Sequence, residues 1–171
     1  SVVRNNLGIA LYAEGKNQEA ISHYKMAIKL KPDYAKAYSN LGAALFAEQK
    51  TEEAISQYKM AIELNPDFAE AYSNLGNALS AEGKIEEAIS HYKMALKLKP
   101  DYALAHNNLG TALVAKGKNE EAISHYKMAI KLSPDYTEAY NNLGIALYAK
   151  GKNQEAISQY KMALKPVTYT Q

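Results

Sequence analysis

The chain has 171 residues, of which 47% are hydrophobic and 22% are charged, and both values are ordinary for a soluble folded protein. The net charge of +2 is too small to favour binding to nucleic acid or to an anionic membrane surface. The chain has no cysteine, which excludes disulfides and thiolate chemistry, and no apolar run approaches the ~20 residues of a membrane span. The lack of cysteine fits a reducing compartment, and no secretory signal is visible at Ser1, so we expect a cytoplasmic location.

A period of 34 residues runs through the whole chain. Pro32, Pro66, Pro100 and Pro134 are separated by this interval, and so is almost every residue between them. A strict period of roughly 20 to 50 residues indicates a repeat architecture, in which each unit buries its apolar face only by stacking on its neighbours. The period predicts a single repeat domain over residues 1–171. Its units are residues 1–34, 35–68, 69–102, 103–136 and 137–170.

Each unit is predicted to form two helices. In the second unit, Ala37, Leu41 and Leu45 fall on one face of a first helix, and Ala54 and Tyr58 begin the same pattern on a second. Gly42, Ala54 and Ala61 are small residues that mark places where helices approach closely. Tyrosine fills the space around them. We therefore expect these residues to form the core.

The joint between the two helices of a unit carries glycine in four of the five units. Glycine at this place suits the left-handed residue that ends a helix. Gln49 is the exception, and we expect it to cost some stability. The residues at the centre of the joints are Gly15, Gln49, Gly83, Gly117 and Gly151.

A 34-residue helix–turn–helix unit with Leu-Gly, then Ala, an aromatic residue, Ala and Pro at these offsets resembles the tetratricopeptide repeat (TPR). The resemblance covers the whole chain and implies an all-α, right-handed superhelix of about ten helices, with first helices lining a concave groove. Members of this family are mostly non-catalytic scaffolds that hold peptide segments of other proteins. Arg4 and His106 depart from the family pattern, which usually has tryptophan or tyrosine there, as in Tyr38, Tyr72 and Tyr140.

The expected groove is the face of the first helices opposite the core. Every unit carries an asparagine equivalent to Asn40 on this face, and stacked helices lie ~10 Å apart. An amide offers two donors and one acceptor, so the five amides could hold the backbone of an extended peptide, in an arrangement that resembles the asparagine ladder of the O-GlcNAc transferases. The alternative is that each asparagine bonds the neighbouring helix. The candidate peptide-binding residues are Asn6, Asn40, Asn74, Asn77, Asn108, Asn142, Lys36, Phe46, Tyr12 and Tyr148.

The other well-known groove of this family, the clamp for the C-terminal carboxylate of chaperones, is disfavoured. A clamp needs lysines and an arginine to form charge-assisted bonds with the carboxylate. Asparagine occupies the arginine position in every unit. The positions for one clamp lysine are occupied by Asn5, Ser39, Ser73, Asn107 and Asn141.

The sequence predicts no catalytic residue, no metal site and no cofactor. His23, His91 and His125 are equivalent positions on second helices, too far apart to share one metal through bonds of ~2 Å, and we expect them to face solvent. No Ser–His–Asp arrangement and no glycine-rich phosphate loop is present. These features indicate a protein that binds rather than catalyses.

The ends of the repeat array suggest self-association. Pro166 interrupts the last second helix, and Val167–Gln171 is too short for a capping helix, so apolar surface is expected at this end and near Val2 and Val3. The leading function is a scaffold for peptide or protein segments. Two alternatives stay open: a self-associating structural module, natural or engineered, and the repeat portion of a larger enzyme such as an O-GlcNAc-type glycosyltransferase.

Overall fold

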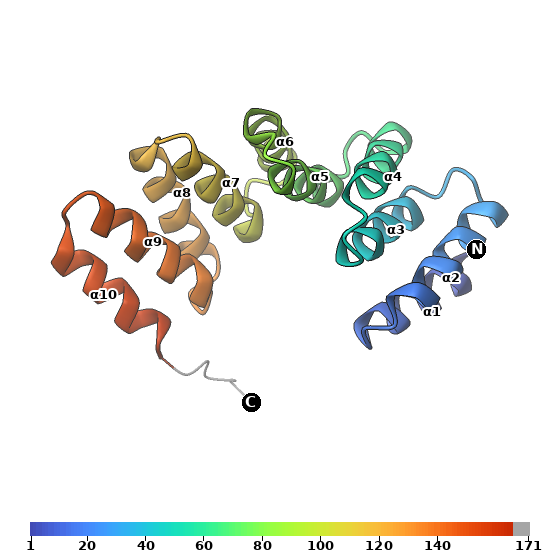
Figure 1. Cartoon of the computed structure of the whole chain (residues 1–171), viewed down its shortest axis with the longest axis horizontal. Helices are drawn as coiled ribbons and strands as arrows, with labels where there is room; N and C mark the ends of the chain where they lie inside the picture. The colour runs from blue at the N-terminus through green and yellow to red at the C-terminus, as the bar shows by residue number, and fades with distance from the viewer. Residues whose placement is uncertain (166–171) are drawn as a thin grey trace. The chain divides into compact units, whose positions relative to one another are not determined.

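The protein consists of paired α-helices throughout the described residues, 1–165, of a computed structural model (Figure 1). This arrangement confirms the prediction of two helices per 34-residue unit and of an all-α repeat fold. No helix in this part of the chain combines the length and the apolar character that crossing a membrane requires. The helices are α1 (Val2–Ala13), α2 (Asn17–Leu30), α3 (Ala35–Ala47), α4 (Thr51–Leu64), α5 (Ala69–Ala81), α6 (Ile85–Leu98), α7 (Ala103–Ala115), α8 (Asn119–Leu132), α9 (Thr137–Ala149) and α10 (Asn153–Ala163).

The chain divides into two compact units, Ser1–Leu98 with α1 to α6 and Lys99–Gln171 with α7 to α10. Within each unit, the two helices of a repeat pack on each other, and each second helix also packs on the first helix of the next repeat. First helices touch one another, as α1 and α3, α3 and α5, and α7 and α9 do. The described second helices of one unit make no such contact, so first helices form the inner side of each unit. That all repeats form one domain stays a prediction.

The two helices of a repeat cross where a glycine faces a tyrosine. A Cβ atom added to Gly76 would lie 2.6 Å from Cε1 of Tyr92, closer than carbon atoms can approach. The same contact recurs in every repeat, and Tyr92 is buried, as are Ala88 and Ala95 on the same helix. The prediction that small residues allow close packing around a tyrosine is therefore confirmed.

The joint between the helices of a repeat depends on one residue in the left-handed region. The joint glycines have φ angles between 74° and 76°, and Gln49 adopts the same conformation with φ of 60°. A residue with a Cβ atom is strained there, because the Cβ approaches the following carbonyl oxygen. The structure thus confirms that Gln49 adopts the left-handed conformation without being glycine, and this strain is the physical reason for the predicted cost in stability.

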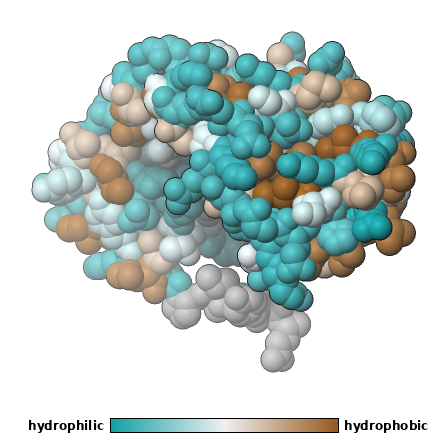
Figure 2. All heavy atoms as spheres, turned by 45° about the vertical axis from the view of Figure 1, so that its right-hand side comes forward, coloured by the Kyte–Doolittle hydropathy of each residue, from teal (hydrophilic) through white to brown (hydrophobic). Residues whose placement is uncertain are grey.

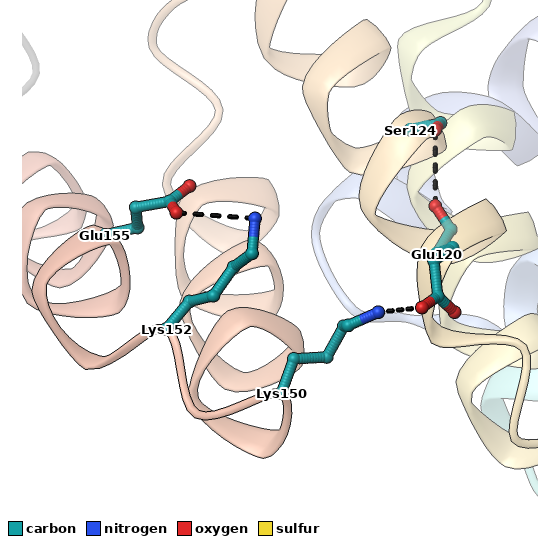
Figure 3. Close-up of polar contacts among 5 residues, drawn as sticks. All are labelled: Glu120, Ser124, Lys150, Lys152 and Glu155. Carbon is teal, nitrogen blue, oxygen red and sulfur yellow. Dashed lines mark hydrogen bonds and ion pairs between the residues drawn. The ribbon is translucent and has the colours of Figure 1, made fainter.

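Consecutive repeats are also matched by polar contacts near the joints. In the second unit, Lys150 of the α9–α10 joint forms an ion pair with Glu120 in the first turn of α8 (Figure 3). In the first unit the equivalent joint residue is Glu48, which accepts hydrogen bonds from Asn17, at 2.9 Å, and from Gln18. These two bonds lower the pKa of Glu48. The joint residue therefore suits the residues at the start of the preceding second helix. Lys150 faces a carboxylate there, and Glu48 faces two amide donors.

Apolar side chains are exposed at both ends of the described chain. Ile157 on α10 is 45% exposed, whereas the equivalent Ile21 and Ile55 are 6% and 8% exposed. Val2 and Val3 are exposed as well. On the face drawn in Figure 2, apolar residues form separate patches within a mainly hydrophilic surface. The prediction made for Pro166 and for residues 167–171 lies outside the described residues.

Candidate functional site

The candidate site is the inner face of the first helices, described separately in each compact unit. In the first unit, Asn40 of α3 donates from Nδ2 to Oδ1 of Asn5 on α1, at 2.9 Å. In the second unit, Asn142 of α9 donates from Nδ2 to Oδ1 of Asn107 on α7, at 3.0 Å. The two acceptors are buried, while the two donors are half-buried. The interpretation that these asparagines bond the neighbouring helix is therefore confirmed at both places.

This contact uses one N–H of each donor amide. An asparagine amide has two N–H donors and a carbonyl oxygen with two lone pairs. Asn40 and Asn142 are half-buried, so they keep the chemical capacity to donate one more bond and to accept others. A structural role and a binding role are thus compatible in the same side chain.

The other predicted amides differ in their surroundings. Asn6 is exposed, and Asn74 and Asn108 are half-buried. Asn77 is also half-buried, and its Oδ1 accepts a hydrogen bond of 2.7 Å from the hydroxyl of Tyr92. Burial raises the pKa of Tyr92, so its hydroxyl stays protonated and able to donate. Asn77 is therefore tied to the helix crossing of its own repeat.

A pocket with a volume of about 170 Å³ opens between α7 and α9. Val114 and Ile145 form its apolar walls, and Asn142 contributes an amide. Tyr126 and Thr111 complete the lining, and they are joined by a hydrogen bond of 3.2 Å from the tyrosine hydroxyl. The pocket therefore combines apolar walls with one amide that has bonding capacity left.

The remaining predicted residues do not line this pocket. Lys36 is exposed, Phe46 is half-buried, and Tyr12 and Tyr148 are 37% and 66% exposed. Tyr12, Phe46 and Tyr148 occupy the repeat position at which α7 has Val114. The smaller valine side chain leaves room where those repeats carry an aromatic ring.

Asn5 and Asn107 were missed as structural residues by the sequence reasoning, which considered them only as positions of a carboxylate clamp. Their role follows from a contact between residues 35 apart in the chain. Asn107 also donates to Oε1 of Glu138 on α9, at 3.1 Å. The sequence signals this contact by asparagine at both partner positions. These are Asn5 and Asn40 in the first two repeats, and Asn107 and Asn142 in the last two.

The second-helix histidines, which were predicted to face solvent, are only partly exposed. His23, His91 and His125 are half-buried, because each lies against the residue 19 positions earlier on the first helix. His91 stacks on Tyr72 with ring centroids 6.0 Å apart, and burial lowers the pKa of His91. No group of three or more histidine, aspartate or glutamate side chains suited to a metal occurs in residues 1–165.

Comparisons with known proteins agree with this architecture. A family model described as TPR repeat matches residues 8–49, 42–83, 76–117 and 110–151. The crystal structure of MamA is similar, with 30% sequence identity and a TM-score of 0.80 over 92% of each chain. TTC0263, a thermophilic TPR protein from Thermus thermophilus, has 26% identity and a TM-score of 0.80, with 94% of this chain and 88% of that chain covered.

A third similar structure is YrrB, described as a TPR protein with an unusual peptide-binding site. It has 20% identity and a TM-score of 0.72, with 94% of this chain and 83% of that chain covered. At this identity the likeness concerns the fold alone. No curated protein sequence matches the chain.

Proposed function

Because this chain belongs to the tetratricopeptide repeat family, we propose that it is a non-catalytic scaffold that binds an extended peptide segment of another protein on its first-helix face. The observation that carries the proposal is the pocket between α7 and α9, with the amide of Asn142 beside it. A site of this kind needs no reacting group. It needs apolar space for a side chain and polar groups for a peptide backbone.

The size of the pocket indicates the kind of side chain that it takes. Its volume of about 170 Å³ is close to that of an engineered apolar cavity of ~150 Å³ that holds benzene. One aliphatic or small aromatic side chain therefore fits between Val114 and Ile145. Neither wall residue is charged, so a charged side chain would lose its hydration there without gaining a partner.

The polar part of the proposal concerns the peptide backbone. Asn142 keeps one N–H and its carbonyl after bonding Asn107, and an extended backbone offers one acceptor and one donor per residue. Asn40 has the same arrangement in the first unit. Each bond of this type contributes ~1 kcal/mol net, so affinity would come from several contacts together.

Peptide selection followed by pocket substitutions tests the proposal. Peptides would be selected from a random library displayed on phage, and their affinity for the whole chain measured by fluorescence polarisation. Val114→Phe fills the pocket with a ring that the equivalent positions of other repeats already accommodate. We expect it to weaken binding at least tenfold while circular dichroism stays unchanged.

The matched control is Lys127→Ala, which changes an exposed residue on the second helix α8. Binding should be unaffected by this change. If the selected peptides lose affinity with Lys127→Ala and keep it with Val114→Phe, the ligand surface lies on the second helices and the proposal is wrong.

A second candidate is head-to-tail association of two copies. The exposure of Ile157, whose counterparts Ile21 and Ile55 are covered by a following repeat, favours it. The helices that carry Ile21 and Ile55 pack on the first helix of the next repeat. In a head-to-tail pair, a first helix of the second copy would pack on α10 in the same way. Sedimentation velocity over a range of concentrations distinguishes the candidates, because self-association raises the sedimentation coefficient without any peptide. Ile157→Glu should abolish that rise.

A further inference from the structure

The first helices of the second compact unit carry a single carboxylate. Within Ala103–Ala115 (α7) and Thr137–Ala149 (α9), Glu138 is the only acidic residue, and neither helix has a lysine or an arginine. Glu138 is exposed, and no lysine or arginine in residues 1–165 forms an ion pair with it. The inner side of this unit therefore presents one negative charge without a paired cation from the described chain.

The Glu138 side chain is held across the two helices. Asn107 of α7, which is fully buried, donates from Nδ2 to Oε1 of Glu138, at 3.1 Å, and its own Oδ1 accepts from Asn142 of α9. A carboxylate has about four lone-pair sites, so this contact leaves Glu138 able to accept further hydrogen bonds. Burial and the neighbouring Glu138 carboxylate raise the pKa of Tyr136 to about 12, so a protonated hydroxyl lies near the same group. The carboxylate is therefore positioned by the protein itself.

Glu138 lies on the same helix face as the pocket between α7 and α9. On α9, Glu138, Asn142 and Ile145 follow one another at i, i+4 and i+7, so they share one face. Asn142 and Ile145 line the pocket, together with Tyr126. Burial raises the pKa of Tyr126, and the Glu138 carboxylate adds to that increase. The negative charge is therefore close enough to act on the lining of the pocket.

From this arrangement we propose that the ligand is a peptide whose lysine or arginine pairs with Glu138 while an apolar side chain fills the pocket. The proposal rests on the proposed function, because it uses the same pocket. A helix rises ~1.5 Å per residue, so Ile145 lies about 10 Å beyond Glu138 along α9. In an extended peptide of the polyproline II type, side chains three positions apart point the same way and are separated by about 9 Å. The basic and the apolar residue are therefore expected three positions apart, in either order.

A cation is the side chain that suits this carboxylate. Arginine can form two parallel N–H bonds with a carboxylate, and lysine can form one charge-assisted bond. An acidic side chain would be repelled by Glu138. The apolar pocket, in turn, offers a cation no partner, so the two binding places take different side chains.

Other repeats show that helix formation does not require a carboxylate at this position. A carboxylate in the first turn complements the helix dipole, and Glu138 has this role as well. However, α3 has Lys36 and α7 has Leu104 at the equivalent position, and both segments are helical. The charge at this position therefore changes between repeats while the fold stays the same, as expected of a position that selects the ligand.

Peptides selected on the whole chain from a random phage library test the proposal. They should be enriched in lysine or arginine three positions from an apolar residue. Glu138→Gln keeps an acceptor for Asn107 and removes the charge, so it should weaken binding about threefold to fivefold in fluorescence polarisation, with an unchanged circular dichroism spectrum. Replacing the basic residue of the peptide by alanine should weaken binding to the unchanged chain by a similar factor. The same replacement should have little further effect on Glu138→Gln.

The matched control is Glu155→Gln, which makes the same change of charge at an exposed position of the second helix α10 and should leave binding unchanged. Charge reversal provides a gain of binding. Glu138→Lys introduces the residue that α3 carries as Lys36, and it should prefer a peptide in which glutamate replaces the basic residue.

The outcomes for this proposal and for the proposed function are distinguishable. Selected peptides that lose affinity with Val114→Phe but lack a basic residue, or that bind Glu138→Gln as tightly as the unchanged chain, would overturn the role of Glu138 alone. Peptides that bind Val114→Phe with full affinity, or a library that yields no binding peptide, would overturn both.

Discussion

Two successive repeats, the helix pair α5–α6 and the helix pair α7–α8, share one scaffold and differ in chemistry. A Cβ added to Gly76 or to Gly110 would lie 2.6 Å from the tyrosine ring of its own repeat. The joint glycines, Gly83 and Gly117, have φ angles of 76° and 74°. Backbone geometry is therefore nearly the same in the two repeats, although each belongs to a different compact unit.

The differences lie at positions that the backbone does not restrict. One repeat pairs Tyr72 with His91, and the other pairs His106 with His125. The tyrosine at the crossing donates to Asn77 in the first case, and Tyr126 donates to Thr111 in the second. The comparison shows that the close contacts at the crossing and the joint are shared by the two repeats, while neighbouring positions carry side-chain contacts that differ between them.

The largest effect is expected from breaking the shared crossing. Gly76→Ala places a methyl group against the buried ring of Tyr92, and overpacking of this kind costs about 2 kcal/mol. The melting temperature, followed by circular dichroism, should fall by about 4 to 8 °C. Gly110→Ala should lower it by a similar amount, because the contact is the same. A tolerated Gly110→Ala beside a damaging Gly76→Ala would show that the two crossings are not equivalent.

A smaller effect, of opposite sign, is expected at the one joint without glycine. Gln49→Gly removes the strain of a side chain at a φ of 60° and should stabilise the protein by about 1 kcal/mol, or 2 to 4 °C in melting temperature. The reverse change, Gly83→Gln, should destabilise it by a similar amount. Space does not limit this joint, because a Cβ at Gly83 would contact nothing within 4 Å. If Gly83→Gln has no effect, backbone strain is not the cause.

The smallest effect concerns the position where the two repeats differ most. Burial against Tyr72 lowers the pKa of His91, with a further decrease from Lys59 and an opposing increase from Glu87. The unfolded chain then binds a proton more readily than the folded chain. The free energy of unfolding should therefore fall as the pH drops from the ordinary histidine value through the lower folded pKa.

Nuclear magnetic resonance titration of the His91 ring measures the folded pKa directly, and urea unfolding at pH 7.5 and 5.5 measures the consequence. His91→Gln should remove this part of the pH dependence. A folded pKa at or above the ordinary value would contradict the role of burial.

The sequence alone determined the repeat, its helices and its core. A period of 34 residues, helical spacing of apolar residues and glycine at the joints are local features, and each acts through backbone conformation or the face of a single helix. They predicted the helix pairs, the glycine–tyrosine crossings and the exception at Gln49. They also placed the amides on the first helices, where Asn40 and Asn142 are found.

The tertiary structure alone decided which side chains meet. Asn40 bonds Asn5 across two repeats, and His106 faces His125 across two consecutive helices, because packing of the helices brings these side chains within reach of each other. The pocket beside Asn142 exists because Val114 is small relative to the space between α7 and α9. A period in the sequence specifies which positions are equivalent, but the distance between two side chains depends on how the helices that carry them pack.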